Sequence, residues 1–425
     1  MRGPLPLAEA IAAVTAAGAP RPRQRVSVTG HDALDTALVV TADDVVAALD
    51  APGFANAGMD GYAVRADDVR TASSHAPVSL RVVGTIAAGT AATGAVAPGE
   101  AVRIFTGAAV PRGADSVIRW EDTDRGDATV QIRDARDAGR NVRPAGEDAR
   151  SGDVVLRAGT RVSAAHRQWL AALGVRELVV HRPPVVALIR TGDELVPPGT
   201  ALAAGAPQVI DSNGVVLRQI VLAAGGAVLD VGIVPDQRDA LAAAMRDAAS
   251  RADVIVTAGG VAAGDFDVTK GAAVDAGGRV DFWKIRARPG SQVAVGAIGD
   301  AVWIGMPGNP VSAAVMGELL LRPLLRAMLG DARPHRPMLP VQLAEPVARD
   351  ATMTLLLRAT LDDDVAPGAL PRARLAGAQG SHLLGPLARA DVLLVVPPGA
   401  DTWAGVALDA IALHDLRGSA RVPGA

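Results

Sequence analysis

The sequence predicts an α/β and β multidomain protein, in which one α/β domain with a mainly parallel sheet accompanies β-rich regions. Three observations support this fold class. The 425 residues exceed what one compact core accommodates. Short strand patterns, bounded by Gly, Pro or Asp, recur across residues 79–156 and 341–413. Between residues 183 and 329 strand and helix patterns alternate, which is typical of right-handed crossovers between parallel strands.

The first predicted element is an amphipathic helix near the N-terminus. Leu5, Leu7, Ile11 and Val14 fall at helical spacing, and Glu9 interrupts the apolar run, which favours a helix over a signal peptide. A β-rich region follows, with candidate strands at Ser79–Gly84, Val102–Phe105, Ser116–Trp120, Thr129–Arg133 and Asp153–Leu156. Ser163 is then expected to cap a helix that runs to Leu173.

The alternating region is predicted to form eight elements. In order they are strand Pro184–Arg190, helix Val215–Ala224, strand Ala227–Val234, helix Arg238–Ser250, strand Asp253–Thr257, helix Val268–Ala276, strand Ala301–Ile304 and helix Pro310–Leu329. The stretch Asp331–Pro340 carries three prolines and reads as a linker. Five short strands then predict a small β domain: Val341–Leu343, Leu355–Thr360, Arg372–Leu375, Val392–Val396 and Val406–Leu413.

The composition excludes several function classes. Cysteine is absent, which removes disulfides, thiolate metal sites and cysteine nucleophiles, and suits a reducing compartment. The net charge is only −3 and the charges are mixed, so we expect no nucleic-acid partner. No apolar window is long enough to span a bilayer. We therefore expect a cytoplasmic protein without a membrane partner.

Three polar loops each follow a predicted strand directly, and parallel strands bring such loops to one common edge. The first is Thr191-Gly192-Asp193-Glu194, and the third runs from Met306 to Ser312. The second, from Gly259 to Asp267, is rich in glycine and opens into a helix, so its backbone N–H groups favour an anion such as phosphate. Taken alone, this loop is equally well explained as a plain strand-to-helix turn.

Carboxylates beside a phosphate site repel their ligand unless a divalent cation lies between them. Glu194 and Asp267 therefore predict Mg²⁺ or a similar hard ion. Asp211 is equally explained as an ordinary helix N-cap. Lys284 is one of only two lysines in a chain rich in Ala, Arg, Gly and Pro, and we expect it to attract phosphate or another oxyanion.

A series of motifs, in this order, resembles the molybdopterin molybdenumtransferases, the bacterial MoeA proteins related to the gephyrin E domain. The motifs are MDGYAVR (59–65), GTIAAG (84–89), RIFTGAAVPRGADSVI (103–118), RPAGED (143–148), TGDEL (191–195), QVIDSN (208–213), TAGGVAAGDFD (257–267), PGNPVSA (307–313) and QGSHLLGPLARAD (379–391). Together the motifs cover nearly the whole chain, and the ordered series is far more specific for the family than any single motif.

The resemblance implies a protomer of four parts. These are an elongated discontinuous domain (1–48 plus 141–177), an inserted β domain (49–140), an α/β molybdopterin-binding domain (178–330) and a C-terminal β domain (331–425). It further implies a homodimer whose active cleft lies between the α/β domain of one subunit and the inserted domain of the other. The implied reaction is Mg²⁺-dependent insertion of molybdate, as substrate, into adenylylated molybdopterin with release of AMP.

The resemblance also implies roles for individual residues. The implied catalytic residues are Asp60, Asp148, Glu194, Asp211, Asp267 and Lys284, of which Glu194, Asp211 and Asp267 are the expected metal ligands. The implied substrate-binding residues are Thr106, Thr191, Gly192, Asp193, Gly259, Gly260, Val261, Arg288, Pro307, Gly308, Asn309, Pro310, Ser312 and Ser381.

The chain departs from the family pattern at two places. Where the family usually reads Lys-Pro-Gly-Lys-Pro, residues 288–292 read Arg-Pro-Gly-Ser-Gln, which removes one positive charge. Residues 54–58 read Phe-Ala-Asn-Ala-Gly in place of the common Phe-Asp-Asn-Ser-Ala. Three hypotheses therefore stand: an active transferase, a diverged paralogue that binds molybdopterin without efficient metal insertion, and a Mg²⁺-dependent hydrolase of another adenylylated compound.

Overall fold

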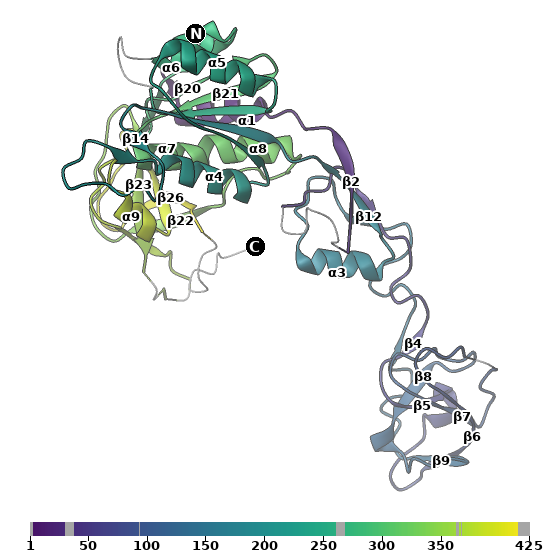
Figure 1. The fold of residues 1–425 in the computed structure, drawn as a ribbon. Helices are drawn as coiled ribbons and strands as arrows, with labels where there is room; N and C mark the ends of the chain where they lie inside the picture. The colour runs from purple at the N-terminus through teal and green to yellow at the C-terminus, as the bar shows by residue number, and fades with distance from the viewer. Residues whose placement is uncertain are drawn as a thin grey trace.

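The computed structural model describes residues 3–29, 38–92, 94–260, 268–362, 365–366 and 368–414. The chain is elongated, with an α/β region and the C-terminal sheet at one end and a small β domain at the other (Figure 1). Between them lie the paired strands β2 (Arg23–Ser27) and β12 (Glu177–His181) and helix α3 (Ala164–Ala172). Among the described residues, no helix has the length and apolar character needed to cross a membrane.

The α/β region is built on a six-stranded sheet in the order β16-β13-β17-β21-β20-β18. Its elements are β13 (Val185–Thr191), α4 (Asn213–Ala223), β16 (Ala227–Val234), α5 (Arg238–Ala249), β17 (Val254–Ala258), α6 (Val268–Asp275), β18 (Arg279–Trp283), β20 (Ala294–Ile298), β21 (Ala301–Met306), α7 (Pro310–Met316), a π-helical turn (Gly317–Leu321) and α8 (Arg322–Met328). The strands β16, β13, β17 and β21 run parallel, while β20 and β18 are antiparallel additions. The expected mainly parallel sheet is therefore confirmed.

Helices cover both faces of this sheet, because alternate side chains of each strand point to opposite faces. Leu188 packs in a core shared with α4, α7 and α8, whereas its neighbour Ile189 packs in a second core shared with α5 and α6. Figure 1 shows these two helical layers on either side of the strands. A sheet buried on both faces needs the near-continuous apolar runs that the sequence supplies here.

The predicted helix Pro310–Leu329 is one helical run, but it is divided by the π-helical turn. Pro323 lies in the first turn of α8 and lacks a backbone N–H, so the regular hydrogen-bond ladder cannot pass through it. The strands β18, β20 and β19 (Ile285–Arg288) were not predicted. The helix expected near the N-terminus, α1, runs from Leu7 to Ala16.

The prediction was wrong for Leu5, which lies in the short strand β1 (Leu5–Pro6) and pairs with β19. The linker prediction was wrong at its end, since β22 (Met338–Leu343) already includes Pro340. These strands join a seven-stranded sheet in the order β1-β19-β23-β24-β22-β26-β25. Its other members are β23 (Thr354–Leu361), β24 (Arg372–Leu375), β25 (Val392–Val396) and β26 (Ala407–Ala412), with α9 (Leu384–Arg389) alongside. Because β19 belongs to the α/β region by sequence, the sheet ties the two parts together.

The small β domain holds a five-stranded sheet in the order β8-β5-β7-β6-β9. Its strands are β5 (Gly61–Val64), β6 (Val78–Ile86), β7 (Glu100–Ile104), β8 (Ser116–Arg119) and β9 (Thr129–Ile132), with the short helix α2 (Ala66–Val69) and a 3₁₀ turn (Trp120–Asp122). The short strands β3 (Val45–Val46), β4 (Asn56–Ala57), β10 (Val142–Arg143) and β11 (Val154–Leu156) form the connections. Ser163 caps α3 as expected, through a reciprocal capping box with His166.

Candidate functional site

The carboxyl ends of the four parallel strands bring the predicted polar loops together. β13 ends at Thr191, β17 at Ala258 and β21 at Met306, all on one edge of the sheet. The loops touch: a side chain at Gly259 would meet the carbonyl oxygen of Thr191 at 2.1 Å, and one at Gly308 would meet the Cα of Gly259 at 3.6 Å. Gly259 and Gly260 both have positive φ angles, 99° and 65°, a backbone conformation that favours glycine.

Exposed carboxylates gather at this edge. The Thr191 hydroxyl donates to Oδ1 of Asp236 (3.2 Å), and the Asp236 backbone N–H donates to Oδ1 of Asp193 (3.1 Å). The Glu194 carboxylate folds over Gly192, where any side chain would lie 2.6 Å from it. Asp236 was not predicted from the sequence, although the signal was present: it follows the strand Ala227–Val234 at the same edge as the other loops.

Asp211 differs from these carboxylates because it is buried and fully engaged. Asp211 is only 2% exposed, and its Oδ2 accepts a hydrogen bond from Arg190 Nε at 2.9 Å. Its other oxygen accepts from the backbone N–H of Gly214 (2.9 Å), in the first turn of α4. The Gly214 contact resembles a helix cap, and the Arg190 contact adds an ion pair to it.

Two residues named by the sequence analysis, Val261 and Asp267, lie outside the described residues. Within the described ranges, no group of three or more His, Asp or Glu side chains is arranged to hold a metal ion. The oxygen chemistry of Glu194 and Asp236 is nevertheless what a hard divalent cation prefers.

The two lysines of the chain meet at one tryptophan. Lys284 follows β18. Trp283 pairs with Ala294, which pairs with Gly305 near the end of β21, so β18 ends at the same sheet edge as β21. The Nζ atoms of Lys284 and Lys270 lie 4.8 Å and 2.8 Å from the centroid of the Trp283 ring. Lys270, in the first turn of α6, was not selected from the sequence, although the scarcity of lysine was a usable signal.

A pocket of about 360 Å³ lies where the α/β region meets the C-terminal sheet. Three loops line it, with residues Arg288, Pro289, Gly290, Ser291, Gln292, Pro307, Asn309, Ser312, Gln379, Gly380 and Ser381. The loops are tied to one another and to α4. The backbone N–H of Val311 donates to the Ser381 carbonyl (3.1 Å), and Asn213 Nδ2 donates to the Gly308 carbonyl (2.8 Å). Pro310 begins α7 beside the pocket. Five of the expected binding residues line this one cavity: Arg288, Pro307, Asn309, Ser312 and Ser381.

Asp60 and Thr106 lie together, but in the small β domain at the far end of the protomer (Figure 1). Oδ1 of Asp60 accepts from both the N–H and the hydroxyl of Thr106, each at 2.7 Å. These donors lower the pKa of Asp60 below its ordinary value, the backbone N–H contributing most. Asp148 lies apart from this pair, and its Oδ2 accepts from Trp169 Nε1 of α3 at 2.6 Å.

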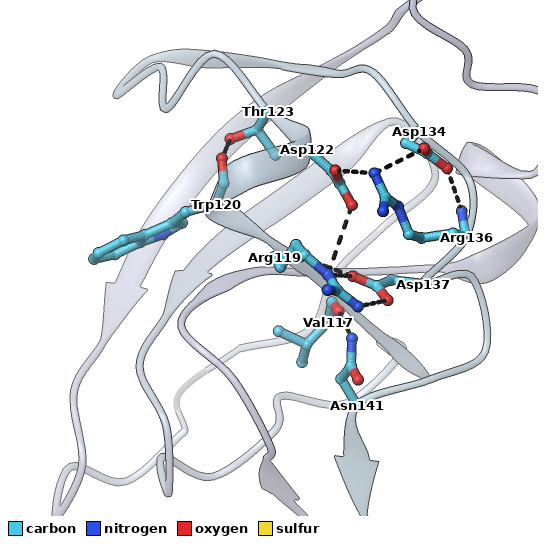
Figure 2. Close-up of polar contacts among 9 residues, drawn as sticks. All are labelled: Val117, Arg119, Trp120, Asp122, Thr123, Asp134, Arg136, Asp137 and Asn141. Atoms are coloured by element: carbon cyan, nitrogen blue, oxygen red, sulfur yellow. Dashed lines mark hydrogen bonds and ion pairs between the residues drawn. The ribbon is translucent and has the colours of Figure 1, made fainter.

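An ion-pair cluster supports the strand end beside Asp60 (Figure 2). Arg119 at the end of β8 donates through Nε and Nη2 to both oxygens of Asp137, each at 2.8 Å. The Arg119 hydrogen bond lowers the pKa of Asp137, whereas burial raises that of Asp122, which pairs with Arg136 at 2.7 Å. Trp120, which follows Arg119, points away from the cluster in Figure 2. Its backbone N–H donates to the Asp60 carbonyl (3.3 Å).

Three regions that together make up most of the chain match models of known protein families. Residues 5–174 match the MoeA N-terminal region (domain I and II), residues 187–327 match a probable molybdopterin binding domain, and residues 340–412 match the MoeA C-terminal region (domain IV). The chain is 38% identical, over 364 residues, to molybdopterin molybdenumtransferase 2 of Mycobacterium tuberculosis, covering 84% of this chain and 88% of that one. The chain belongs to the MoeA family of molybdopterin molybdenumtransferases.

Other MoeA family members support this assignment. The molybdopterin molybdenumtransferase of Haemophilus influenzae is 36% identical over 299 residues, 70% of this chain and 72% of that one. The crystal structure of the molybdopterin biosynthesis MoeA protein from Pyrococcus horikosii superposes with a TM-score of 0.79 at 28% identity, covering 97% of this chain and all of that one. The multidomain MoeA fold expected from the sequence is thus confirmed.

Proposed function

We propose that this MoeA family member inserts molybdate into adenylylated molybdopterin in a Mg²⁺-dependent reaction that releases AMP, and that it acts as a cytoplasmic homodimer. The observation that carries the proposal is the convergence of a polar pocket and a carboxylate-bearing sheet edge through the shared loop 307–312. A reaction that brings molybdate to an adenylylated substrate needs an oxyanion site and a phosphate site side by side.

The pocket suits a tetrahedral oxyanion such as molybdate. Arg288 supplies a positive charge, and the hydroxyls of Ser291, Ser312 and Ser381 and the amide of Asn309 supply neutral donors. The guanidinium of Arg288 offers its donors in a planar fork, whereas a lysine at this position would present a point charge. The replacement of the usual family lysine by Ser291 leaves a neutral donor in its place.

The sheet edge suits the phosphate of an adenylylated substrate. The glycine loop at Gly259 and Gly260 lets a ligand approach the backbone without side chains in the way, and Lys284 lies at the same edge. Glu194 and Asp236 are exposed oxygen ligands that suit Mg²⁺, with Asp267 as a further expected ligand. When bound, the cation would neutralise phosphate charge and make a coordinated water more acidic. Asp211 would act indirectly, by holding Arg190 and the start of α4.

The separation of the expected residues within one chain supports a homodimer. Asp60 and Thr106 are presented by the small β domain, distant in one protomer from the pocket and the sheet edge. A second copy that brings its small β domain to this edge would complete the site. The ionised Asp60 carboxylate, favoured by Thr106, could then accept a hydrogen bond or a proton from the substrate.

The test is an AMP-release assay with purified protein, adenylylated molybdopterin, Mg²⁺ and varied molybdate. The proposal expects AMP release that rises with molybdate and stops with a chelator. Tight binding without turnover would instead favour a diverged carrier, and turnover that ignores molybdate would favour a hydrolase of another adenylylated compound.

A further inference from the structure

A group of aromatic and guanidinium side chains lies beside Asp60 in the small β domain. The rings of Phe105 and Trp120 meet edge to face, with their centroids 5.5 Å apart. The guanidinium carbons of Arg103 and Arg125 lie 5.2 Å and 5.7 Å from the centroid of the Trp120 ring. These four residues form an aromatic platform, in which both rings are only half-buried.

The strand register places this platform on the same face of the sheet as the Asp60 side chain. Gly61 of β5 pairs with the last residue of β7 on one side and the last residue of β8 on the other. One residue further along, Asp60 lies between Phe105 and Trp120, and residues directly opposite each other in antiparallel strands share a face. The hydrogen bond from the Trp120 N–H to the Asp60 carbonyl (3.3 Å) agrees with this register. Phe105 also directly precedes Thr106, whose hydroxyl donates to Asp60 (2.7 Å).

The platform contains features that lower the stability of the fold. Arg125 is exposed, and its φ angle is 59°, a left-handed conformation that favours glycine. The Arg103 Nε and Trp120 Nε1 atoms are buried and, within the described residues, have no hydrogen-bond partner. Smaller or apolar side chains at these positions would avoid both costs. The presence of two arginines and a tryptophan is explained when the platform binds a ligand.

The chemistry of the platform fits a planar heteroaromatic ring. Aromatic rings and arginine guanidinium planes both stack against such rings. Arg103 pairs with Asp127 at 3.0 Å, so Arg125 supplies the additional attraction for a ligand that also carries phosphate. Adenylylated molybdopterin contains two heteroaromatic rings, an adenine and a pterin, as well as phosphate.

We propose that the aromatic platform, centred on Trp120, binds a heteroaromatic ring of the substrate in the active site of the partner subunit. This inference rests on the proposed function, in which the small β domain of one copy completes the site of the second. The platform then holds the substrate beside Asp60. Loss of Trp120 should therefore weaken substrate binding more than it slows the chemical step.

The test compares Trp120→Leu and Trp120→Phe with the matched control Trp403→Leu, using the full-length protein. Trp403 lies between β25 and β26 and is 64% exposed. The AMP-release assay gives kcat and the KM for adenylylated molybdopterin, and thermal unfolding gives Tm. We expect Trp120→Leu to raise KM about tenfold, within the range that aromatic stacking contributes, while kcat stays within about twofold. Trp120→Phe should keep most of the affinity, and Trp403→Leu should change neither constant.

Arg125→Gly separates substrate binding from stability. It removes the guanidinium and relieves the left-handed conformation, so Tm should stay or rise while KM rises about threefold. Calorimetric titrations of Trp120→Leu with AMP and with molybdopterin identify the ring that stacks. A Kd raised for AMP assigns the platform to the adenine, and a Kd raised for molybdopterin assigns it to the pterin.

An unchanged KM in folded Trp120→Leu, or an equal rise in Trp403→Leu, would overturn this inference. AMP release by the wild-type protein would leave the proposed function standing in that case. A rise in KM as large in Trp120→Phe as in Trp120→Leu would also overturn it, since any aromatic ring should stack. If the wild-type protein releases no AMP, both the proposed function and this inference fail.

Discussion

The two ends of the protomer differ in how completely each assembles its polar residues. At the α/β end, the loops that follow the parallel strands form a carboxylate-bearing edge, and the loops 288–292, 307–312 and 379–381 line a pocket. At the other end, Asp60 and Thr106 form a tight hydrogen-bonded pair on a small sheet, without the phosphate and oxyanion features of the first. Under the proposed function, the first end holds most of the site, and the second end supplies its residues to the site of a second copy.

The largest expected effect comes from the α/β end. Glu194→Gln removes an exposed carboxylate that we expect to bind cation and orient water, so AMP release should fall roughly 100-fold or more. The fold should persist, because the described contacts of Glu194 do not anchor a core element. The control is Glu177→Gln, an exposed residue of β12 paired with Arg25 at 3.1 Å, which should retain full activity. Normal turnover by Glu194→Gln would remove this residue from the site.

The division between the two ends predicts rescue in trans. Asp60→Asn and Glu194→Gln should each be nearly inactive as homodimers. Unfolded, mixed and refolded together, half of the dimers would be mixed, and each would contain one site free of both changes. The mixture should therefore regain about a quarter of wild-type AMP release. Activity no greater than the mean of the two variants would show that each protomer works alone.

The pocket has one positive charge fewer than the family pattern, so restoring that charge should moderately raise the affinity for molybdate. Ser291→Lys restores the charge that the family pattern usually has, and we expect Kd for molybdate to fall up to about fivefold, the upper range for an exposed ion pair. The gain should shrink as salt is raised. Ser74→Lys, an exposed change in the small β domain, is the control and should have no effect. A flat response at position 291 would mean that the serine is equivalent to lysine there.

The smallest expected effect concerns how kcat/KM depends on pH through Asp60, in the small β domain. Thr106 lowers the pKa of Asp60, so the carboxylate is ionised over a wider range of acid pH and loses its charge only as the pH falls through that lowered pKa. Thr106→Val removes the hydroxyl donor and keeps the N–H donor. The acid limb of kcat/KM should therefore move to higher pH, with little change at neutral pH. An unmoved acid limb would exclude Asp60 as the group that titrates there.

The sequence predicted the α/β end better than the rest, for a physical reason. Parallel strands buried on both faces need apolar runs, and the fully buried strand β17 (Val254–Ala258) lies within one residue, at each end, of the predicted strand Asp253–Thr257. The short strands β18 and β20 were missed, since β18 alternates charged and apolar residues over only five positions. Applying the sheet-edge rule to every strand would have found Asp236 as well as Glu194.

Other features depend on tertiary contacts that no local pattern encodes. Arg358 occupies a strand of leucines, where the sequence gives no sign that it contacts a loop twenty residues away. The ion pair of Asp211 could not be predicted because its partner Arg190 lies twenty-one residues earlier, on β13. The pocket itself requires β19 to leave the α/β region and pair with β23, a topology that composition and periodicity do not determine.

The most direct test of the proposed oxyanion site is a crystal of this protein soaked with tungstate, whose tungsten scatters X-rays anomalously and which has the charge and shape of molybdate. The proposal predicts an anomalous peak in the pocket, within hydrogen-bonding distance of Arg288, Ser312 or Ser381. A well-occupied peak elsewhere, with none in this pocket, would contradict it.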